Sequence, residues 1–238
     1  MKKTEKVQYT LHRKKNRRHI ALKVDDDGLV KVYAPVYTPI GAVEEVITTH
    51  LEWIKEKVKE VNSLPPPREA HTYEDGDIFL LLGKELTLRV ETIASGASVC
   101  FRDQDSLIVK RNVQGSKRTI KSSLESYYRS YGMELYSSLV ERWVDEIAEK
   151  PTRPLKGVRI AAFPKRWGSC TQEGELSFAL RSLMLPLRLI DYLALHETIH
   201  LYEFNHSRRF TALLDLYMED WRRRQREMSL LRRQVATL

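Results

Sequence analysis

The order of apolar and polar residues predicts strands near the beginning of the chain. Three short segments, residues 7–11, 20–24 and 29–33, have the alternating or clustered apolar positions of half-buried strands. From Pro39 the apolar residues recur at three- and four-residue spacing as far as Val58, which predicts a helix. Three successive prolines at positions 65–67 then predict the end of this segment and a stiff connector.

The same pattern divides the rest of the chain into a β-rich and an α-rich part. Four apolar segments predict strands, at residues 78–82, 86–90, 99–101 and 107–109. A helical stripe of leucine, tyrosine and tryptophan then runs from Leu124 to Ile147 and ends before Pro151. We therefore expect an α+β protein. A β-rich region with one helix, residues 1–115, precedes an α-rich region, residues 116–238, and both can share one core.

Two more strands and two more helices are predicted in the α-rich region. Residues 158–161 and 176–180 are strand-like, and we expect them to pair as a hairpin with Gly174 in the connection. One helix is predicted from about Pro186 to Tyr202, and a last one from about Ser207 into an arginine-rich end.

The first of these helices contains the sequence His196-Glu197-Thr198-Ile199-His200, which matches the pattern H-E-x-x-H. Residues four apart lie on one face of a helix, so both imidazoles can reach the same metal ion. Glu197 lies about 100° further round the helix, where it can reach a water molecule without binding the metal. This arrangement predicts a hydrolytic zinc site with Glu197 as the catalytic base.

A catalytic zinc ion usually has three protein ligands, so a third one is needed. His206 follows His200 by six residues, just beyond the predicted helix end, and can approach the metal from another side. Glu203 and Asp215 are the alternatives. The pattern also occurs on ordinary helices, where the histidines are half-buried and hydrogen-bonded. Three of the seven histidines fall within eleven residues, which favours a metal site with His206 as its third ligand.

The segment Lys165-Arg166-Trp167-Gly168-Ser169-Cys170 is a second candidate part of the site. It combines two cations, a large aromatic residue and a glycine that permits close approach of the backbone. We expect Lys165, Arg166, Trp167 and Ser169 to contact the substrate, and a structural loop around a buried tryptophan is the alternative. A cysteine beside a zinc motif is more often packed than reactive, so we expect no nucleophilic role for Cys170.

Composition narrows the class of protein. The 238 residues are 42% hydrophobic and 30% charged, and no apolar run reaches the roughly 18–20 residues that span a bilayer. The beginning of the chain lacks the apolar stretch of a secretory signal, and two cysteines are too few for a disulfide framework. We therefore expect a cytoplasmic protein with no membrane partner.

The net charge of +8 is concentrated in two blocks, residues 13–18 and residues 222–226 with Arg232 and Arg233. Such blocks can attract nucleic acid or another polyanion, and they also occur on solvated turns and helix faces. Neither block contains an aromatic residue on which a base could stack. We therefore favour solvated faces over a nucleic-acid partner.

Three segments, in this order, resemble the YgjP-like metallopeptidase family: Arg166 to Cys170 (RWGSC), Leu187 to His200, and Asn205-His206-Ser207 with Phe210 (NHSxxF). The similarity covers residues 155–215 well and is weaker upstream. It implies a zincin-like catalytic region within residues 116–238, with His196, His200 and His206 as zinc ligands and Glu197 as the catalytic residue. Thr198 and Thr211 replace the leucine and tryptophan usual in the family, and neither is a ligand position.

These observations predict a zinc-dependent hydrolase. We favour a metallopeptidase, in which Glu197 takes a proton from a zinc-activated water and the strand before the helix pairs with an extended peptide. The family has also been associated with nucleoside triphosphate pyrophosphatase activity on UTP, for which Lys165, Arg166 and Arg181 would face the phosphates. A third alternative is a nucleic-acid-associated protein with a structural zinc ion and Cys170 as a fourth ligand.

Overall fold

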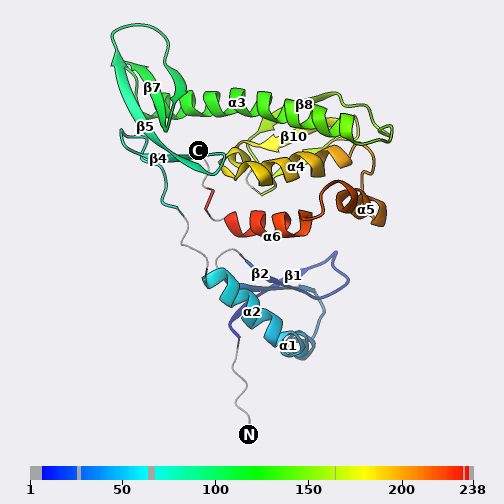
Figure 1. Ribbon diagram of the computed structural model, residues 1–238. Coiled ribbons are helices and arrows are strands. Elements are labelled where there is room, and N and C mark those ends of the chain that lie inside the picture. The colour runs from blue at the N-terminus through cyan, green and yellow to red at the C-terminus, as the bar shows by residue number, and fades with distance from the viewer. Residues whose placement is uncertain (1–6, 26–27, 64–67, 164, 233, 236–238) are drawn as a thin grey trace. The chain divides into compact units, whose positions relative to one another are not determined.

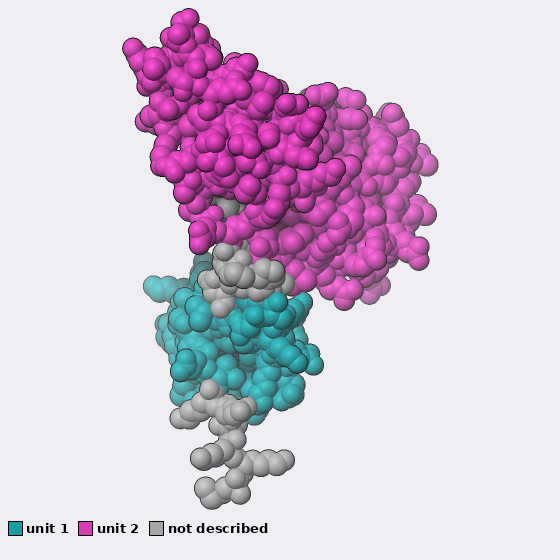
Figure 2. Space-filling view, turned by 60° about the vertical axis from the view of Figure 1, so that its left-hand side comes forward, with its two compact units in different colours: residues 1–66 teal, residues 67–238 magenta. Residues whose placement is uncertain are grey.

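The computed structural model describes residues 7–25, 28–63, 68–163, 165–232 and 234–235. The chain forms two compact units, unit 1 (residues 1–66) and unit 2 (residues 67–238), coloured teal and magenta in Figure 2. Both combine strands with helices, so the predicted α+β class is confirmed (Figure 1). The predicted connector of three prolines, residues 65–67, lies outside the described residues.

Unit 1 is a three-stranded sheet with two helices. Its strands are β1 (Tyr9–Lys14), β2 (Ala21–Val24) and β3 (Val30–Pro35), and β3 lies between a parallel β1 and an antiparallel β2. The helices are α1 (Ile40–Thr49) and α2 (Leu51–Asn62), where the sequence predicts one continuous helix. The helix is interrupted at His50, whose backbone leaves the helical region (φ −106°, ψ 17°).

Unit 2 contains two sheets. The strands β4 (Ile78–Leu81), β5 (Lys84–Ile93), β6 (Val99–Asp103) and β7 (Ser106–Asn112) form one sheet in the order β4-β5-β7-β6. The strands β8 (Gly157–Ala161), β9 (Gly168–Cys170) and β10 (Glu175–Ala179) form the other in the order β8-β10-β9.

The second sheet corrects the predicted hairpin between residues 158–161 and 176–180. β8 and β10 run parallel, with Ile160 beside Phe178, and the hairpin joins β9 to β10 through a turn at Gly174. The positive φ of Gly174 (90°) suits this turn. No alternation of apolar and polar residues marks β9, because the strand has only three residues. β10 is therefore the central strand, and β9 forms an edge of the sheet.

The helices of unit 2 are α3 (Lys117–Glu146), α4 (Leu187–Ile199), α5 (Arg208–Tyr217) and α6 (Trp221–Leu231), and a 3₁₀ turn, η1 (Leu180–Met184), precedes α4. α4 contacts α3, α5, α6 and β9, which places it at the centre of the unit (Figure 1). Among the described residues no helix combines the length and the hydrophobicity needed to cross a bilayer.

The four-stranded sheet belongs to the same core as the C-terminal helices. The Tyr128 hydroxyl of α3 donates a hydrogen bond to the Leu80 carbonyl of β4 (2.7 Å), and the Leu82 amide donates to the Leu183 carbonyl of η1 (2.7 Å). Phe79 and Leu88 join one hydrophobic cluster with residues of α3 and α4. The strands before residue 115 and the helices after it therefore share one core within unit 2.

Candidate metal centre

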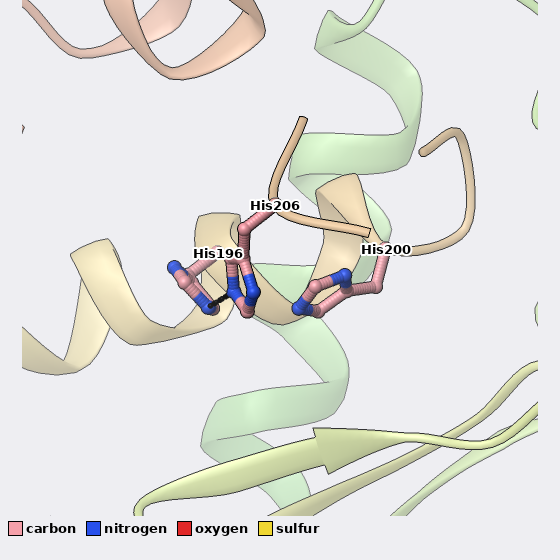
Figure 3. A group of neighbouring side chains, drawn as sticks. All are labelled: His196, His200 and His206. Atoms are coloured by element: carbon pink, nitrogen blue, oxygen red, sulfur yellow. Dashed lines mark hydrogen bonds between the residues drawn. The ribbon is translucent and has the colours of Figure 1, made fainter. Parts of the chain in front are cut away.

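Three histidine rings come together where α4 ends. His196 lies in the last turn of α4, His200 directly follows the helix, and His206 lies in the segment that leads to α5. Their ring centroids form a triangle with sides of 5.2, 5.1 and 4.8 Å, and the three rings lie beside one another in Figure 3. One nitrogen atom from each ring lies within 4.8 Å of the other two. The described part of the chain contains no second group of this kind.

Phe210 holds the three rings together from one side. Its own ring is almost fully buried, and its centroid lies 5.0 Å from that of His196, 4.7 Å from that of His200 and 4.7 Å from that of His206. Ser207 caps α5, because its hydroxyl accepts a hydrogen bond from the Phe210 amide (3.3 Å). The NHSxxF segment thus supplies one histidine and the aromatic residue that packs against all three.

The nitrogen atoms of this group suit a metal ion. The Nε2 atoms of His196 and His206 are 3.1 Å apart, close to the separation of about 3.3 Å between two nitrogens that share a tetrahedral zinc ion. Nδ1 of His200 lies 3.3 Å from the Glu203 carbonyl, which can only accept, so this nitrogen carries the proton and Nε2 keeps a free lone pair. Nδ1 of His196 is shielded from solvent without a hydrogen-bond partner among the described residues.

Burial favours the neutral form of His196 and His200. The pKa of His196 is lowered to about 3, mainly by burial and to a smaller extent by the proximity of His200 and His206. Burial is also the main cause that lowers the pKa of His200, followed by His206 and opposed by a hydrogen bond to the Glu203 carbonyl. Neutral imidazole is the form that binds a metal ion, so His196 and His200 require little proton release before binding.

Glu197 points from α4 towards the edge strand β9. Its side chain is only 5% exposed, and this burial raises its pKa to about 8 against the opposing charge of Arg166. The backbone of Gly168 lies against the carboxylate: a methyl group at Gly168 would meet Oε1 at 2.4 Å and Cδ at 2.7 Å. Position 168 must therefore be glycine if Glu197 is to keep this position.

The alternative ligands make other contacts. Asp215 accepts hydrogen bonds from the Trp221 indole (2.8 Å) and from Arg222 (2.5 Å), and the Glu203 carboxylate accepts one from the Asn205 amide (3.4 Å). Neither they nor Cys170 belong to the group of neighbouring ligand atoms found among the described residues. Burial, with a smaller contribution from Glu197, raises the pKa of Cys170 to about 11, so its thiol is protonated at neutral pH.

A family model described as YgjP-like, metallopeptidase domain matches residues 18–230 of the chain. The chain belongs to the YgjP-like metallopeptidase family. The resemblance seen in the three sequence segments is thereby confirmed, and membership supports a hydrolase that uses a metal ion. Searches for similar chains among curated proteins and among solved structures found no match.

The RWGSC segment of this YgjP-like chain runs into β9, next to Glu197. Trp167 is half-buried, and the guanidinium of Arg181 lies over its ring, 4.4 Å from the centroid. Arg166 is exposed and lies over the ring of Phe163 (4.5 Å), while Lys165 is exposed and its carbonyl accepts a hydrogen bond from Arg232. Ser169 is in β9, opposite Ser177 of β10.

The free backbone groups of this region belong to β9. The Trp167 carbonyl accepts a hydrogen bond from the Ala179 amide (2.7 Å), and the Thr171 amide donates one to the Glu175 carbonyl (2.9 Å). Alternate residues of an antiparallel pair exchange such bonds, so the N–H and C=O groups of Gly168 and Cys170 face away from β10. This corrects the expectation that the strand at 176–180 receives a peptide, because β10 has a neighbour on each side.

Two residues of the site have roles that the sequence pattern did not identify. The glycine of RWGSC indicated a close approach of the backbone, but not that Glu197 is the group approached. Phe210 was recognised only as part of a resemblance, because its contacts with three rings depend on how the segment after α4 folds back.

Proposed function

We propose that this protein is a zinc-dependent metallopeptidase in which His196, His200 and His206 hold the ion and Glu197 is the general base. The observation that carries the proposal is the convergence of three imidazoles at the end of the helix that also carries the buried carboxylate of Glu197. Three nitrogen ligands, with no fourth His, Cys, Asp or Glu joining them among the described residues, match a catalytic site that keeps one position open. Imidazole ligands suit zinc, which is the basis for choosing this metal.

Glu197 has the position of a catalytic base, and a cation bound by the neighbouring histidines would favour the ionised carboxylate that burial alone disfavours. A bound zinc ion would supply Lewis acidity, lowering the pKa of water to about 7 and polarising the substrate carbonyl. Glu197 takes a proton from the attacking water and passes it to the leaving nitrogen. The backbone of Gly168 restricts the positions open to the carboxylate, and a restricted carboxylate suits proton transfer at one place.

The edge strand β9 supports a peptide as the substrate. An extended peptide can pair with the N–H and C=O groups of Gly168 and Cys170, as strands are added to the edge of a sheet in other complexes. Because Gly168 also contacts Glu197, a peptide bound along this edge would have its backbone beside the catalytic base.

A nucleoside triphosphate is the second candidate substrate, and the charge of Arg166 favours it. Arg166 is close enough to Glu197 to lower the pKa of that carboxyl group, and both Arg166 and Lys165 are exposed. Cations in this position can face the phosphate oxygens of a nucleotide and stabilise the charge that develops during cleavage.

The two substrates are distinguished by one experiment. Zinc-loaded protein is incubated separately with a fluorescently labelled unfolded protein and with a panel of nucleoside triphosphates, and the Glu197→Gln variant is the control in both. We expect fragments from the unfolded protein, no pyrophosphate, and no fragments from the variant although it retains zinc. Pyrophosphate release that Glu197→Gln abolishes, without peptide cleavage, would establish the pyrophosphatase instead. Near-normal turnover by Glu197→Gln would exclude its role as base.

A further inference from the structure

The two basic blocks differ in how their charges are paired. In the second block Arg222 pairs with Asp215, and Arg223 and Arg224 both pair with Asp220. Arg226 forms no ion pair among the described residues, and Arg233 lies outside them. In the first block Arg13 donates to the carbonyls of residues 36 and 38 (2.7 Å each). The four cations that follow, at positions 14, 15, 17 and 18, form no ion pair with any carboxylate of the described residues. Their charge is available to a partner.

These four cations lie on one connection of unit 1. β1 ends at Lys14 and β2 begins at Ala21, and because the two strands flank β3, the connection crosses over the end of β3. A pocket of about 420 Å³ opens there, and its lining contains no carboxylate: Lys14, Asn16, Arg17, Arg18, His19 and Ala21. A pocket of this charge suits a phosphate group.

An aromatic pair lies next to this pocket, on the face of the sheet opposite the core. Leu11 and Val32 pack into the core with α1 and α2, which lie on one side of the sheet in Figure 1. Strand alternation therefore places His12 and Tyr33 on the other face. Their rings stack, with centroids 5.0 Å apart and planes inclined by 20°. The aromatic partner that the block itself lacks is thus supplied by a neighbouring strand.

The cations of the connection extend over this aromatic pair. The guanidinium of Arg17 lies 5.3 Å from the centroid of the Tyr33 ring, and the ammonium of Lys14 lies 5.7 Å from it. Lys23 of β2 lies on the same face, because its partner Lys31 is two residues from Tyr33 along β3. We call this surface, formed by His12, Lys14, Arg17, Lys23 and Tyr33 with the connection 15–20, the basic sheet face.

We propose that the basic sheet face binds single-stranded nucleic acid. Lys14, Lys15 and Arg18 would contact phosphates. Unpaired bases would stack on the planar groups of Arg17, His12 and Tyr33. A duplex hides its bases from such a surface, so a single strand fits better. The proposal is independent of the metal centre, which belongs to unit 2. Residues 12–17 of this face precede the segment matched by the family model, whereas Arg18, Lys23 and Tyr33 lie within it.

The test measures binding of the full-length protein to a labelled single strand of about 20 nucleotides, long enough to cross the whole face. If Lys14, Lys15 and Arg18 contact phosphates while Arg17 stacks on a base, the slope of log affinity against log salt is about −2, and raising salt from about 50 to about 200 mM weakens binding about 20-fold. The double variant Lys15→Gln/Arg18→Gln is expected to bind at least about tenfold more weakly and to lower the slope by about 1.4. Both side chains are exposed, so folding is not at risk.

Matched control variants distinguish binding at this face from attraction to positive charge elsewhere on the protein and from nonspecific binding. Arg222→Gln/Arg223→Gln removes the same charge from the paired block and should bind like the wild type. Tyr33→Leu should reduce affinity to that measured for an abasic strand of the same length, whereas Tyr37→Leu, at a residue 96% exposed beyond β3, should not. Glu197→Gln should bind normally. Equal loss in both double variants, equal affinity for the normal and abasic strands, or no binding at low salt would each overturn the proposal.

Discussion

The α-carbon of Gly168 lies against the carboxylate of Glu197, so that a methyl group there would meet Oε1 at 2.4 Å. The edge strand β9 therefore packs directly against the candidate base on α4. This contact restricts the movement of the Glu197 carboxylate. Such a restriction matters for a catalytic base, because small displacements of catalytic groups have large effects on rate.

Gly168→Ala is expected to lower turnover without removing the metal. The new methyl group would push the Glu197 carboxylate aside, and a displacement of about 1 Å can reduce the rate about 100-fold. Steady-state hydrolysis and bound zinc are measured on the same preparation. Gly157→Ala in β8 is the matched control, since a methyl group there meets nothing within 4 Å. Equal activity of the two variants would show that Gly168 does not position the base.

Glu197→Gln should change how the stability of the metal-free protein depends on pH. Burial raises the pKa of Glu197 to about 8 from 4.5, so the folded state holds an extra proton between these values. The stability linked to this proton is complete below pH 4.5 and is lost as pH rises through 8. Between about pH 6 and about pH 9 the wild type should lose about 2–3 kcal/mol that the variant keeps. Urea unfolding in chelator measures the difference, and parallel curves would contradict the assignment.

Cys170→Pro tests pairing of a peptide along β9. Proline removes the backbone N–H of residue 170, which faces the free edge, and an edge strand tolerates this change. Loss of one hydrogen bond should raise KM for a peptide about tenfold with little change in kcat. Cys170→Ala alters only the side chain and should behave as the wild type. If alanine and proline have the same effect, the edge does not bind the substrate.

His206→Ala should weaken zinc binding while the fold remains. His206 is exposed, so its removal should change the free energy of unfolding of the metal-free protein by only about 0.5 kcal/mol. Zinc affinity, measured by competition with a chromophoric chelator, should fall at least about 100-fold, because only two imidazoles remain. His19→Ala, at another exposed histidine, is the control. Unchanged affinity would exclude His206 as a ligand.

The spacing of residues along the chain predicted the helices and the contacts within them. The helix around His196 and the long helix α3 follow from residue spacing, and the short distance between His196 and His200 follows from the geometry of one helix turn. The position of His206 does not follow from residue spacing, because its place beside His196 depends on the turn of the chain before α5, where Ser207 and Phe210 make their contacts.

Contacts between distant segments were predicted less well. The parallel pairing of β8 with β10 brings together residues that no hairpin signal connects, so the sequence favoured the simpler hairpin. Tyr33 gave no signal as a partner of Arg17, because the two meet only through the register of β1 with β3. Whether a basic block can bind nucleic acid therefore depends on residues from neighbouring strands as well as on the block itself.

The central claim is that three histidines hold the metal and leave a position open for water. X-ray absorption at the zinc edge of the loaded protein tests it most directly, because it counts ligands and separates sulfur from nitrogen and oxygen by distance, at about 2.3 Å against about 2.0–2.1 Å. We predict three imidazole nitrogens and one further oxygen per zinc ion, with one imidazole lost in His206→Ala. A sulfur ligand, which Cys170 would supply, or fewer than three imidazoles in the wild type would contradict the account.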